Sequence, residues 1–471
     1  MGRTFENLKS LILTILIFSS LILTGSLWFD NYQGLSLLVS SVHNNMIDKF
    51  SNDKEISIIY DKIITPYKVT VINPDKNKWI FYETNSVHQS AWDMVKTRLN
   101  SLNGDSEIIT GKVKEWDGLF SRKSIVLEFG GAIHYDILRL AIPSLPKETN
   151  AFNNVEKIAI TKSLEGNTMY ILQNDDGKKS LYKVLFKGND DELEIFMENC
   201  ENMKAPVKYL ELEKVGTTNF FGNKEVVPKS SVLFPVSNIN NHKEAVKQIK
   251  TSTHFDVEDE YTINRFLIDI FNNTDFAKFI TNDESKIFIN DDKSFIKFEK
   301  NGMVEYINNA KQAEEAVSAQ KNFNVAINFI NNMRVYDDIY LLSANEKDGI
   351  YTFTFSIAID GVLIGMNNEV ICDDNHAIIE IQVYEGNVKY FKGKLLNIEL
   401  LENERYIANF AHNILDEVLS KVDNNAKINI YNIELMYIVD KAGTYYPNWV
   451  VKYSEKKTEE LKNAIIYVLK K

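Results

Sequence analysis

Residues 351–360 read YTFTFSIAID, which is the clearest strand pattern in this chain of 471 residues. Aromatic and aliphatic side chains occupy every second position from Tyr351 to Ile359, and Thr352, Thr354 and Ser356 lie between them. Successive side chains of a β-strand point to opposite faces, so the alternation predicts one buried and one solvated face. The fold is therefore expected to contain a sheet that is covered on one side.

Hairpin signals flank this strand on both sides. Asn301-Gly302 joins two short apolar runs, residues 295–298 and 303–307, and supplies the positive φ angles that a type I′ turn needs. Hairpins are also predicted around residues 174–177 and 385–387. Further strands are predicted at residues 67–72, 79–82, 124–129, 169–173, 181–186, 428–439 and 449–453.

Amphipathic helices alternate with the strand pairs. They are predicted at residues 92–102, 261–271, 310–331 and 407–421. A closing helix is also expected, because Glu459 and Glu460 would stand in its first turn and Lys470 and Lys471 at its end. Strand pairs with helices packed on one face predict an α+β protein.

The chain length suggests about three folded units behind a short N-terminal segment. Residues 1–34 would form a cytoplasmic tip and a transmembrane anchor, followed by exported domains at residues 35–235, 236–335 and 336–471. Pro228 and Pro235 mark the passage into the second exported domain. Each exported domain is expected to consist of antiparallel sheets with helices packed on them.

The anchor is predicted from residues 11–29, LILTILIFSSLILTGSLWF, which contain no charged side chain. As a helix, these 19 residues would span roughly 28 Å, close to the hydrocarbon thickness of a bilayer. Arg3 and Lys9 precede the span, so the N-terminus is expected in the cytoplasm and the bulk of the chain outside it. Trp28 and Tyr32 would then lie among the outer headgroups and fix the anchor at the membrane interface.

Two alternatives concern this segment. A signal peptide could be cleaved at residues 24–26, although the apolar run is longer than the usual signal core of about 7–15 residues. Ser20 and Thr24, four positions apart on one helix face, could let a partner helix approach closely. Their hydroxyl groups could instead bond to carbonyl groups of their own helix.

Composition and motifs disfavour several function classes. The net charge of −12 repels phosphate backbones, so no nucleic-acid partner is expected. Two cysteines cannot form a disulfide framework, and no Walker, Rossmann, serine-hydrolase or HExxH motif occurs. Residues 373–380 contain carboxylates and a histidine, but this pattern is more typical of a solvated hairpin end than of a metal site. No catalytic residue, metal ligand or cofactor is predicted.

Two stretches resemble a known family. The short basic entry into one leucine- and isoleucine-rich span, residues 9–28, resembles the start of YycH proteins. Residues 433–437, IELMY, followed by residues 446–450, YPNWV, are similar to the terminal module that YycH shares with YycI. In this unit Pro447 ends a loop and Trp449 anchors the returning strand in the core. Similar strand–Pro–Trp units occur in other exported modules such as PepSY domains.

The resemblance implies a function. YycH proteins regulate the YycG (WalK) sensor histidine kinase, which controls cell-wall metabolism in Gram-positive bacteria, and they act together with YycI. The family implies no catalytic residues, and it implies the kinase, a YycI-like protein and the membrane as partners. The alternative from another class is an exported cell-envelope enzyme or wall-binding protein whose site carries no recognised motif.

Overall fold

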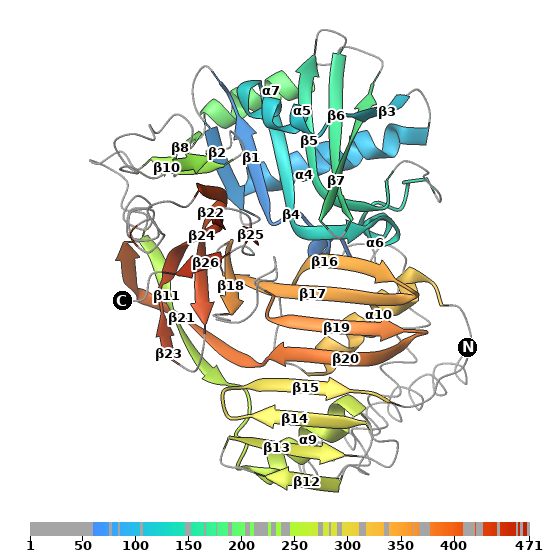
Figure 1. Ribbon diagram of the computed structural model, residues 1–471, viewed down its shortest axis with the longest axis vertical. Coiled ribbons are helices and arrows are strands. Elements are labelled where there is room, and N and C mark those ends of the chain that lie inside the picture. Colours follow the sequence, from blue (N-terminus) through green and yellow to red (C-terminus); the bar gives the residue numbers. More distant parts are fainter. Residues whose placement is uncertain are drawn as a thin grey trace, which may run out of the picture. The chain divides into compact units, whose positions relative to one another are not determined.

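The computed structural model describes residues 60–468, apart from gaps of one to five residues and the longer stretches 212–224, 237–244, 310–316, 367–376, 408–419 and 421–426. The described residues form mostly antiparallel sheets with a few helices, which confirms the α+β class (Figure 1). The predicted span at residues 11–29 lies outside the described residues. Among the helices of residues 60–468 that are described, none has the length and apolar character needed to cross a membrane.

The first sheet contains nine strands, and every neighbouring pair in it is antiparallel. The hairpin predicted around residues 174–177 joins two of them, and Gly177 in its turn has a φ of 85°. In spatial order the strands are β3 (Glu107–Gly111), β7 (Lys178–Leu185), β6 (Gly166–Asp175), β5 (Asn154–Ser163), β4 (Ser124–His134), β1 (Lys68–Ile72), β2 (Lys78–Tyr82), β8 (Lys208–Glu211) and β10 (Leu233–Val236).

Helix α4 (Ser86–Asn100) covers one face of this sheet (Figure 1). It begins after Asn85, whose side chain accepts a hydrogen bond from the backbone N–H of Val87, as an N-cap residue does. Its buried Trp92 packs edge-on against Phe129 of β4, with ring centroids 5.9 Å apart. The predicted helix at residues 92–102 is therefore found, and it begins six residues earlier than its apolar pattern. Helices α6 (Tyr135–Ala141) and α7 (Glu192–Asn202) contact β4 and β5 of the same sheet.

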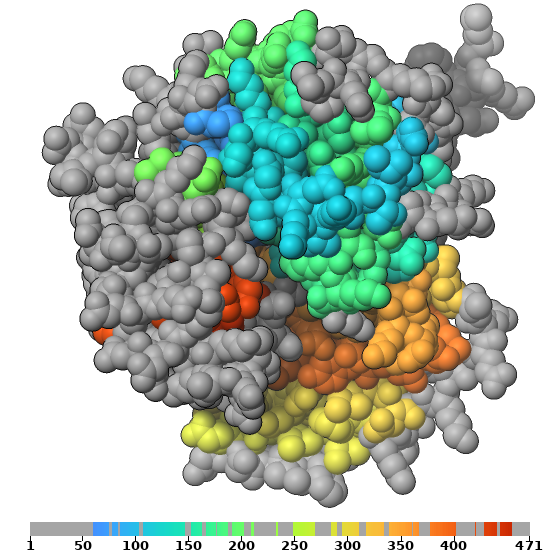
Figure 2. All heavy atoms as spheres, turned by 45° about the horizontal axis from the view of Figure 1, so that its top comes forward, coloured from blue at the N-terminus to red at the C-terminus, as the bar shows by residue number. Residues whose placement is uncertain are grey.

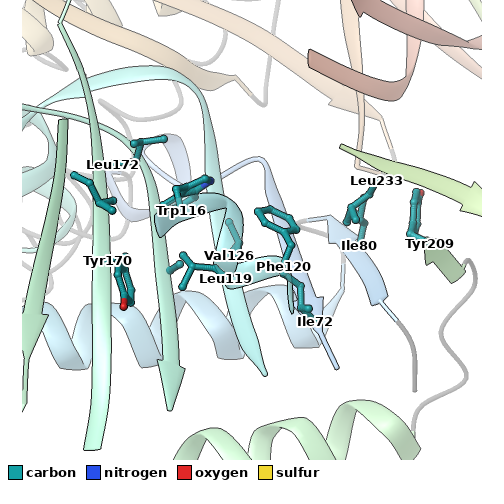
Figure 3. Close-up of a cluster of buried hydrophobic side chains, with 12 residues drawn as sticks. Ile72, Ile80, Trp116, Leu119, Phe120, Val126, Tyr170, Leu172, Tyr209 and Leu233 are labelled. Atoms are coloured by element: carbon teal, nitrogen blue, oxygen red, sulfur yellow. The ribbon is translucent and has the colours of Figure 1, made fainter. Parts of the chain in front are cut away.

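Short helical turns cover the opposite face. Trp116 of α5 (Lys114–Asp117) and two residues of η2 (Gly118–Ser121), Leu119 and Phe120, pack against the sheet in one buried cluster (Figure 3). Figure 2 shows the side chains of this part of the chain, coloured cyan, as a continuous patch on the face in view. Central strands such as β1 and β6 are thus buried on both faces, whereas β3 at the edge of the sheet is exposed. The other members of the cluster are Ile72, Ile80, Val126, Ala159, Tyr170, Leu172, Leu181, Tyr209 and Leu233.

The second sheet contains the strand from which the sequence argument starts. Phe353 and Phe355 of β17 (Ile350–Ile359) are fully buried, as the alternation predicts. Thr354 and Ser356 are also buried, so the face that the sequence analysis expected to be solvated is covered at these two positions. In spatial order its strands are β12 (Ala277–Thr281), β13 (Ser285–Ile289), β14 (Phe295–Glu299), β15 (Met303–Ile307), β20 (Asn387–Lys394), β19 (Ile379–Tyr384), β17 (Ile350–Ile359) and β16 (Tyr340–Lys347).

Two helices pack on one face of the second sheet. Helix α9 (Glu260–Phe271) places Phe266 against Phe298 of β14, with ring centroids 5.5 Å apart. Helix α10 (Ala319–Asn332) places Phe323 against Phe353, with ring centroids 5.3 Å apart. The helix predicted at residues 261–271 is confirmed. The helix predicted at residues 310–331 is found as α10, and residues 310–316 lie outside the described residues.

The C-terminal strands form a third group. The long strand β22 (Lys427–Val439) pairs in antiparallel fashion with β24 (Pro447–Lys457) and in parallel with β18 (Val362–Met366) and β9 (Glu225–Val227). The sequence analysis expected only antiparallel sheets, and these two parallel pairings show that this expectation is wrong for the third group. The remaining strands are β25 (Glu460–Leu461) and β26 (Ile465–Val468) beside β24, and a separate sheet of β21 (Leu396–Ile407), β11 (Ala245–Thr253) and β23 (Gly443–Tyr445).

Three local predictions differ from the structure. The prediction of a closing helix is wrong, because residues 465–468 form β26 and pair with residues 450–453 of β24. The prediction of a helix at residues 407–421 is wrong at its first residue, because Ile407 is the last residue of β21. Of the other residues in this range, only Ser420 is described. The hairpin of β14 and β15 is confirmed, but only Gly302 of its turn has a positive φ, so the turn is not type I′.

The domain boundaries stay predictions. Hydrogen-bonded strand pairs cross the predicted boundary between residues 335 and 336, since β15 pairs with β20 and β11 pairs with β21. Strand β4 also reaches from the first sheet to the second, where Ile133 pairs in parallel with Ala344 of β16. The predicted units are therefore joined by backbone pairing as well as by side chains.

Candidate functional site

The chain enters the described fold through residues 60–67, which we call the entry segment. Residues 60–63 are helical, and the backbone N–H of Ile64 donates a hydrogen bond to the carbonyl oxygen of Tyr60 at 2.7 Å. Tyr60, Ile63 and Ile64 are buried. This segment directly follows residues 1–59, which lie outside the described residues. Any link between the predicted anchor and the sheets must run through it.

Helix α4 holds the entry segment with three side chains at positions i, i+4 and i+8. This spacing places His88, Trp92 and Lys96 on one helix face. The Nε1 of Trp92 donates to Oδ1 of Asp61 at 3.0 Å, and Nζ of Lys96 donates to both carboxylate oxygens of Asp61, at 2.9 and 2.8 Å. One turn earlier, Nε2 of His88 lies 2.6 Å from the carbonyl oxygen of Pro66. The segment is thus fastened to α4 near both of its ends.

Helix α10 contacts the first residue of the same segment. The hydroxyl of Tyr60 donates to Oδ1 of Asn324 at 2.5 Å, and its ring lies 6.0 Å from the ring of Phe323. Tyr60 and Asp61 are neighbours in the chain, yet they bond to helices that pack on different sheets. A displacement of the chain at this point would therefore act on both helices.

The last residue of the segment reaches the third group of strands. The hydroxyl of Tyr67 donates to Oε2 of Glu434 on β22 at 3.2 Å. The next residue, Lys68, forms an ion pair with Glu128 at 3.0 Å, and Lys157 pairs with the other oxygen of Glu128 at 2.5 Å. The entry segment therefore contacts residues from each of the three predicted exported domains.

Electrostatics stabilise this arrangement. Burial by itself would raise the pKa of Glu128, but the ammonium groups of Lys157 and Lys68 outweigh burial and lower the pKa to about 2. The carboxylate is therefore charged at neutral pH and fully paired.

The same reasoning applies on α4. Burial would lower the pKa of Lys96, but the carboxylates of Asp61 and Asp93 outweigh burial and raise it. Lys96 is therefore a cation that bridges its own helix and the entry segment.

The arrangement links one chain segment to several elements of the fold. Its charged groups are paired with one another inside the fold. Within the described part of residues 60–468, no group of three or more histidine, cysteine or acidic side chains is placed to hold a metal ion. What the geometry provides is a rigid connection between one chain segment and three sets of secondary structure.

The predicted site residues are placed as follows. Ser20, Thr24, Trp28 and Tyr32 lie outside the described residues, so the predicted helix contacts and interface anchors stay predictions. Pro447 is the first residue of β24 and lies opposite Tyr437. Trp449 lies opposite Leu435 and is 7% exposed. The neighbouring pair in this register is Glu434 and Val450, so β22 carries both the strand pairing of Trp449 and the contact to Tyr67.

The entry segment itself was missed by the sequence analysis. Trp92 was assigned to an apolar helix face, and its polar neighbours on that face, His88 and Lys96, were not considered. Three residues that can donate hydrogen bonds, spaced by four on a largely buried helix, are a usable signal for an internal polar contact. The acceptor, Asp61, could not be identified, because the pairing joins residues 31 and 35 positions apart.

Comparison with known proteins gives structural neighbours only. No protein-family model and no curated protein matches the chain. Its structure is similar to that of YycH. The YycH structure, from Bacillus subtilis, has 12% sequence identity and a TM-score of 0.48, and the match covers 85% of this chain and 96% of YycH. YycH is also the family that residues 9–28 and 433–450 resemble.

Two further solved structures are similar over about half of the chain. An uncharacterized protein from Eubacterium rectale has 14% identity and a TM-score of 0.32, with 50% of this chain and 86% of that chain covered. The C-terminal domain of YpeB from Bacillus megaterium has 13% identity and a TM-score of 0.25, with 46% of this chain and 100% of that domain covered.

Proposed function

We propose that this chain is a membrane-anchored extracytoplasmic protein that regulates a sensor histidine kinase of the YycG (WalK) type, and through it cell-wall metabolism. The anchor is residues 11–29, the N-terminus is cytoplasmic, and the sheets lie outside the membrane. The chain acts without chemistry of its own, through contacts of the membrane helix and the exported domains with the kinase and a YycI-like partner.

The entry segment is the observation that carries this proposal. A regulator of this kind must pass a change between its exported body and its membrane helix. Residues 30–67 connect the two, and the last eight of them, the entry segment, are fixed by Asp61 to α4, by Tyr60 to α10 and by Tyr67 to β22. A flexible linker would let the exported body move independently of the chain that precedes it, whereas part-buried hydrogen bonds and an ion pair restrict that movement.

The family resemblance and the anchor pattern support the choice of partner. A single charge-free span with basic residues before it suits a protein that meets the kinase inside the membrane. Small side chains at Ser20 and Thr24 suit close helix contacts.

The proposal is tested by exchanging the anchor. Transcription from a kinase-dependent promoter is measured in cells that lack the chain and then receive it in one of three forms. These are the full chain, the chain with residues 11–29 replaced by an unrelated apolar span, and residues 35–471 exported with a cleavable signal. We expect the full chain alone to restore the original output. An output that is the same with and without the full chain would exclude a regulatory role.

A further inference from the structure

Of the three α4 side chains that hold the entry segment, His88, Trp92 and Lys96, only His88 has a buried polar atom without a hydrogen-bond partner among the described residues. The side chain is fully buried, with 0% of its surface exposed. Its Nε2 lies 2.6 Å from the carbonyl oxygen of Pro66, and its Nδ1 has no hydrogen-bond partner among the described residues. Such an atom in a buried site calls for an explanation.

The contact with Pro66 fixes the tautomer of the imidazole. A carbonyl oxygen only accepts, so Nε2 carries the hydrogen and Nδ1 is a bare acceptor in the neutral ring. Protonation would place a second N–H and a positive charge at Nδ1, where no described group can accept the bond. An unpaired buried charge costs far more free energy than an unpaired acceptor. The state in which the entry segment is bound to α4, here called the fastened state, therefore accommodates only the neutral ring.

Among the residues that the structure describes, no carboxylate near the ring compensates for this. The charged side chains on the entry segment and α4 are Asp61, Lys62, Asp93, Lys96 and Arg98, and none of them bonds to His88. On the strands behind α4 the charged residues are Lys68, Lys78 and Glu128, which share the sheet face of Ile72 and Val126, opposite to the face that α4 covers. Burial therefore dominates, and it lowers the pKa of His88, with a smaller opposing effect of the Pro66 carbonyl.

We propose that His88 makes the fastening of the entry segment acid-sensitive, so that the segment detaches from α4 when one proton from solvent binds to Nδ1 of His88. In the detached state the ring is hydrated and both nitrogen atoms can donate to water. The device joins the pH of the surrounding medium to the same segment that connects the anchor with the sheets. It does not depend on the identity of any partner protein.

The sign and size of the effect follow from linkage. A detached histidine has an ordinary pKa of about 6.5, and the fastened one has a lower pKa, so opening takes up a proton below about pH 6.5. Fastening is strongest above this value and weakens as the pH falls toward the lower pKa. The opening equilibrium should rise between pH 7.5 and pH 5.5, by up to about tenfold, the limit set by the ordinary pKa of the detached histidine.

Hydrogen exchange at the backbone N–H of Ile64 measures this opening. That N–H is bonded to the carbonyl oxygen of Tyr60 within one helical turn of the segment. A single turn is not stable in water by itself, so this bond breaks and the N–H exchanges when the segment leaves α4. The full chain in detergent micelles is compared at pH 7.5 and pH 5.5, after division by the intrinsic exchange rate. We expect the protection factor to fall, by up to about tenfold.

Two variants make the test specific. In His88→Gln the amide can still donate to the Pro66 carbonyl but does not titrate, so the fall should disappear. His134→Gln is the matched control, because the pKa of His134 is also lowered by burial, yet its Nδ1 accepts from the N–H of Asp136 at the start of α6. The His134→Gln protein should keep the same fall as the unmodified chain.

Several results would overturn the proposal. One is a protection factor in the unmodified chain that does not change with pH, and another is the same fall in His88→Gln. If His88→Gln does not fold, an NMR titration of the labelled imidazole in the unmodified chain decides. We expect His88 to remain neutral to below pH 6.5, and titration at or above pH 6.5 would exclude the device.

Discussion

At the scale of single residues, Lys96 offers an internal comparison. Its ammonium group pairs with Asp61 of the entry segment at 2.8 Å and with Asp93 of its own helix at 2.9 Å. Only Asp61 also accepts the N–H of Trp92, whose side chain is fully buried. Removing either carboxylate removes one of the two negative charges that pair with Lys96. Only the loss of Asp61 also leaves a buried donor, Nε1 of Trp92, without its acceptor.

We therefore expect Asp61→Ala to lower the free energy of unfolding by about 1–3 kcal/mol, since a buried donor loses its acceptor. The control Asp93→Ala should cost no more than about 0.5 kcal/mol, as for exposed helix pairs. Urea denaturation of the full chain in detergent measures both. Equal losses in the two variants would show that the entry segment is not held by Asp61.

A second residue-scale prediction concerns Glu128 and pH. Its folded pKa of about 2 lies below the ordinary value of 4.5, so its charge stabilises the fold above pH 4.5 and loses this effect as the pH falls through 2. The difference corresponds to about 3 kcal/mol at pH 7 and about 1.4 kcal/mol at pH 3.

The variant Glu128→Gln should be less stable by at least about 3 kcal/mol at pH 7, because two lysines lose their shared partner. The deficit should shrink toward pH 3. Glu115→Gln is the control, since the Glu115 side chain is 36% exposed and pairs with Lys183 at the surface. A deficit for Glu128→Gln that does not vary between pH 7 and pH 3 would contradict the assignment.

At the scale of elements, the two large sheets meet where β4 approaches β16. Gly130 of β4 lies so close to this strand that an added Cβ would stand 2.6 Å from Cδ2 and 3.1 Å from Cβ of Leu342. A side chain at this position therefore requires Leu342 to shift.

We expect Gly130→Ala to lower the free energy of unfolding by about 1–3 kcal/mol through overpacking. The double variant with Leu342→Ala should lose less than the sum of the two single losses, because each change relieves the other. Gly118→Ala is a control without crowding, since nothing lies within 4 Å of its added Cβ. Additive losses in thermal unfolding would mean that β4 and β16 are not in this close contact.

The elements also show how far sequence reasoning reaches. The alternation in residues 351–360 and the amphipathic run at residues 261–271 predict β17 and α9, because local burial decides them. Residues 465–468 were predicted as helix from end charges, yet they form β26 because β24 provides a pairing edge. The turn at Gly302 and the contacts of Asp61 depend on distant partners, which no local pattern reveals.

At the scale of the whole molecule, the account depends on the anchor as a contact surface. Replacing both Ser20 and Thr24 by Leu keeps the span apolar but adds bulk to the face where a partner helix would pack. Association with the kinase spans should weaken roughly tenfold to a hundredfold, because interhelical polar contacts contribute about 0.6–2 kcal/mol each. A membrane two-hybrid signal at equal expression measures this. An unchanged signal would remove Ser20 and Thr24 from the interface.

The central claim is that kinase regulation passes through the entry segment, and kinase-dependent transcription tests it most directly. The output is compared in cells that carry the unmodified chain, Asp61→Ala or Asp93→Ala, each present in the membrane at the same level. We predict that Asp93→Ala regulates like the unmodified chain, because the bonds of Asp61 to α4 remain. Asp61→Ala should lose most of the regulation although its anchor and sheets are intact. Full regulation by Asp61→Ala would contradict the account.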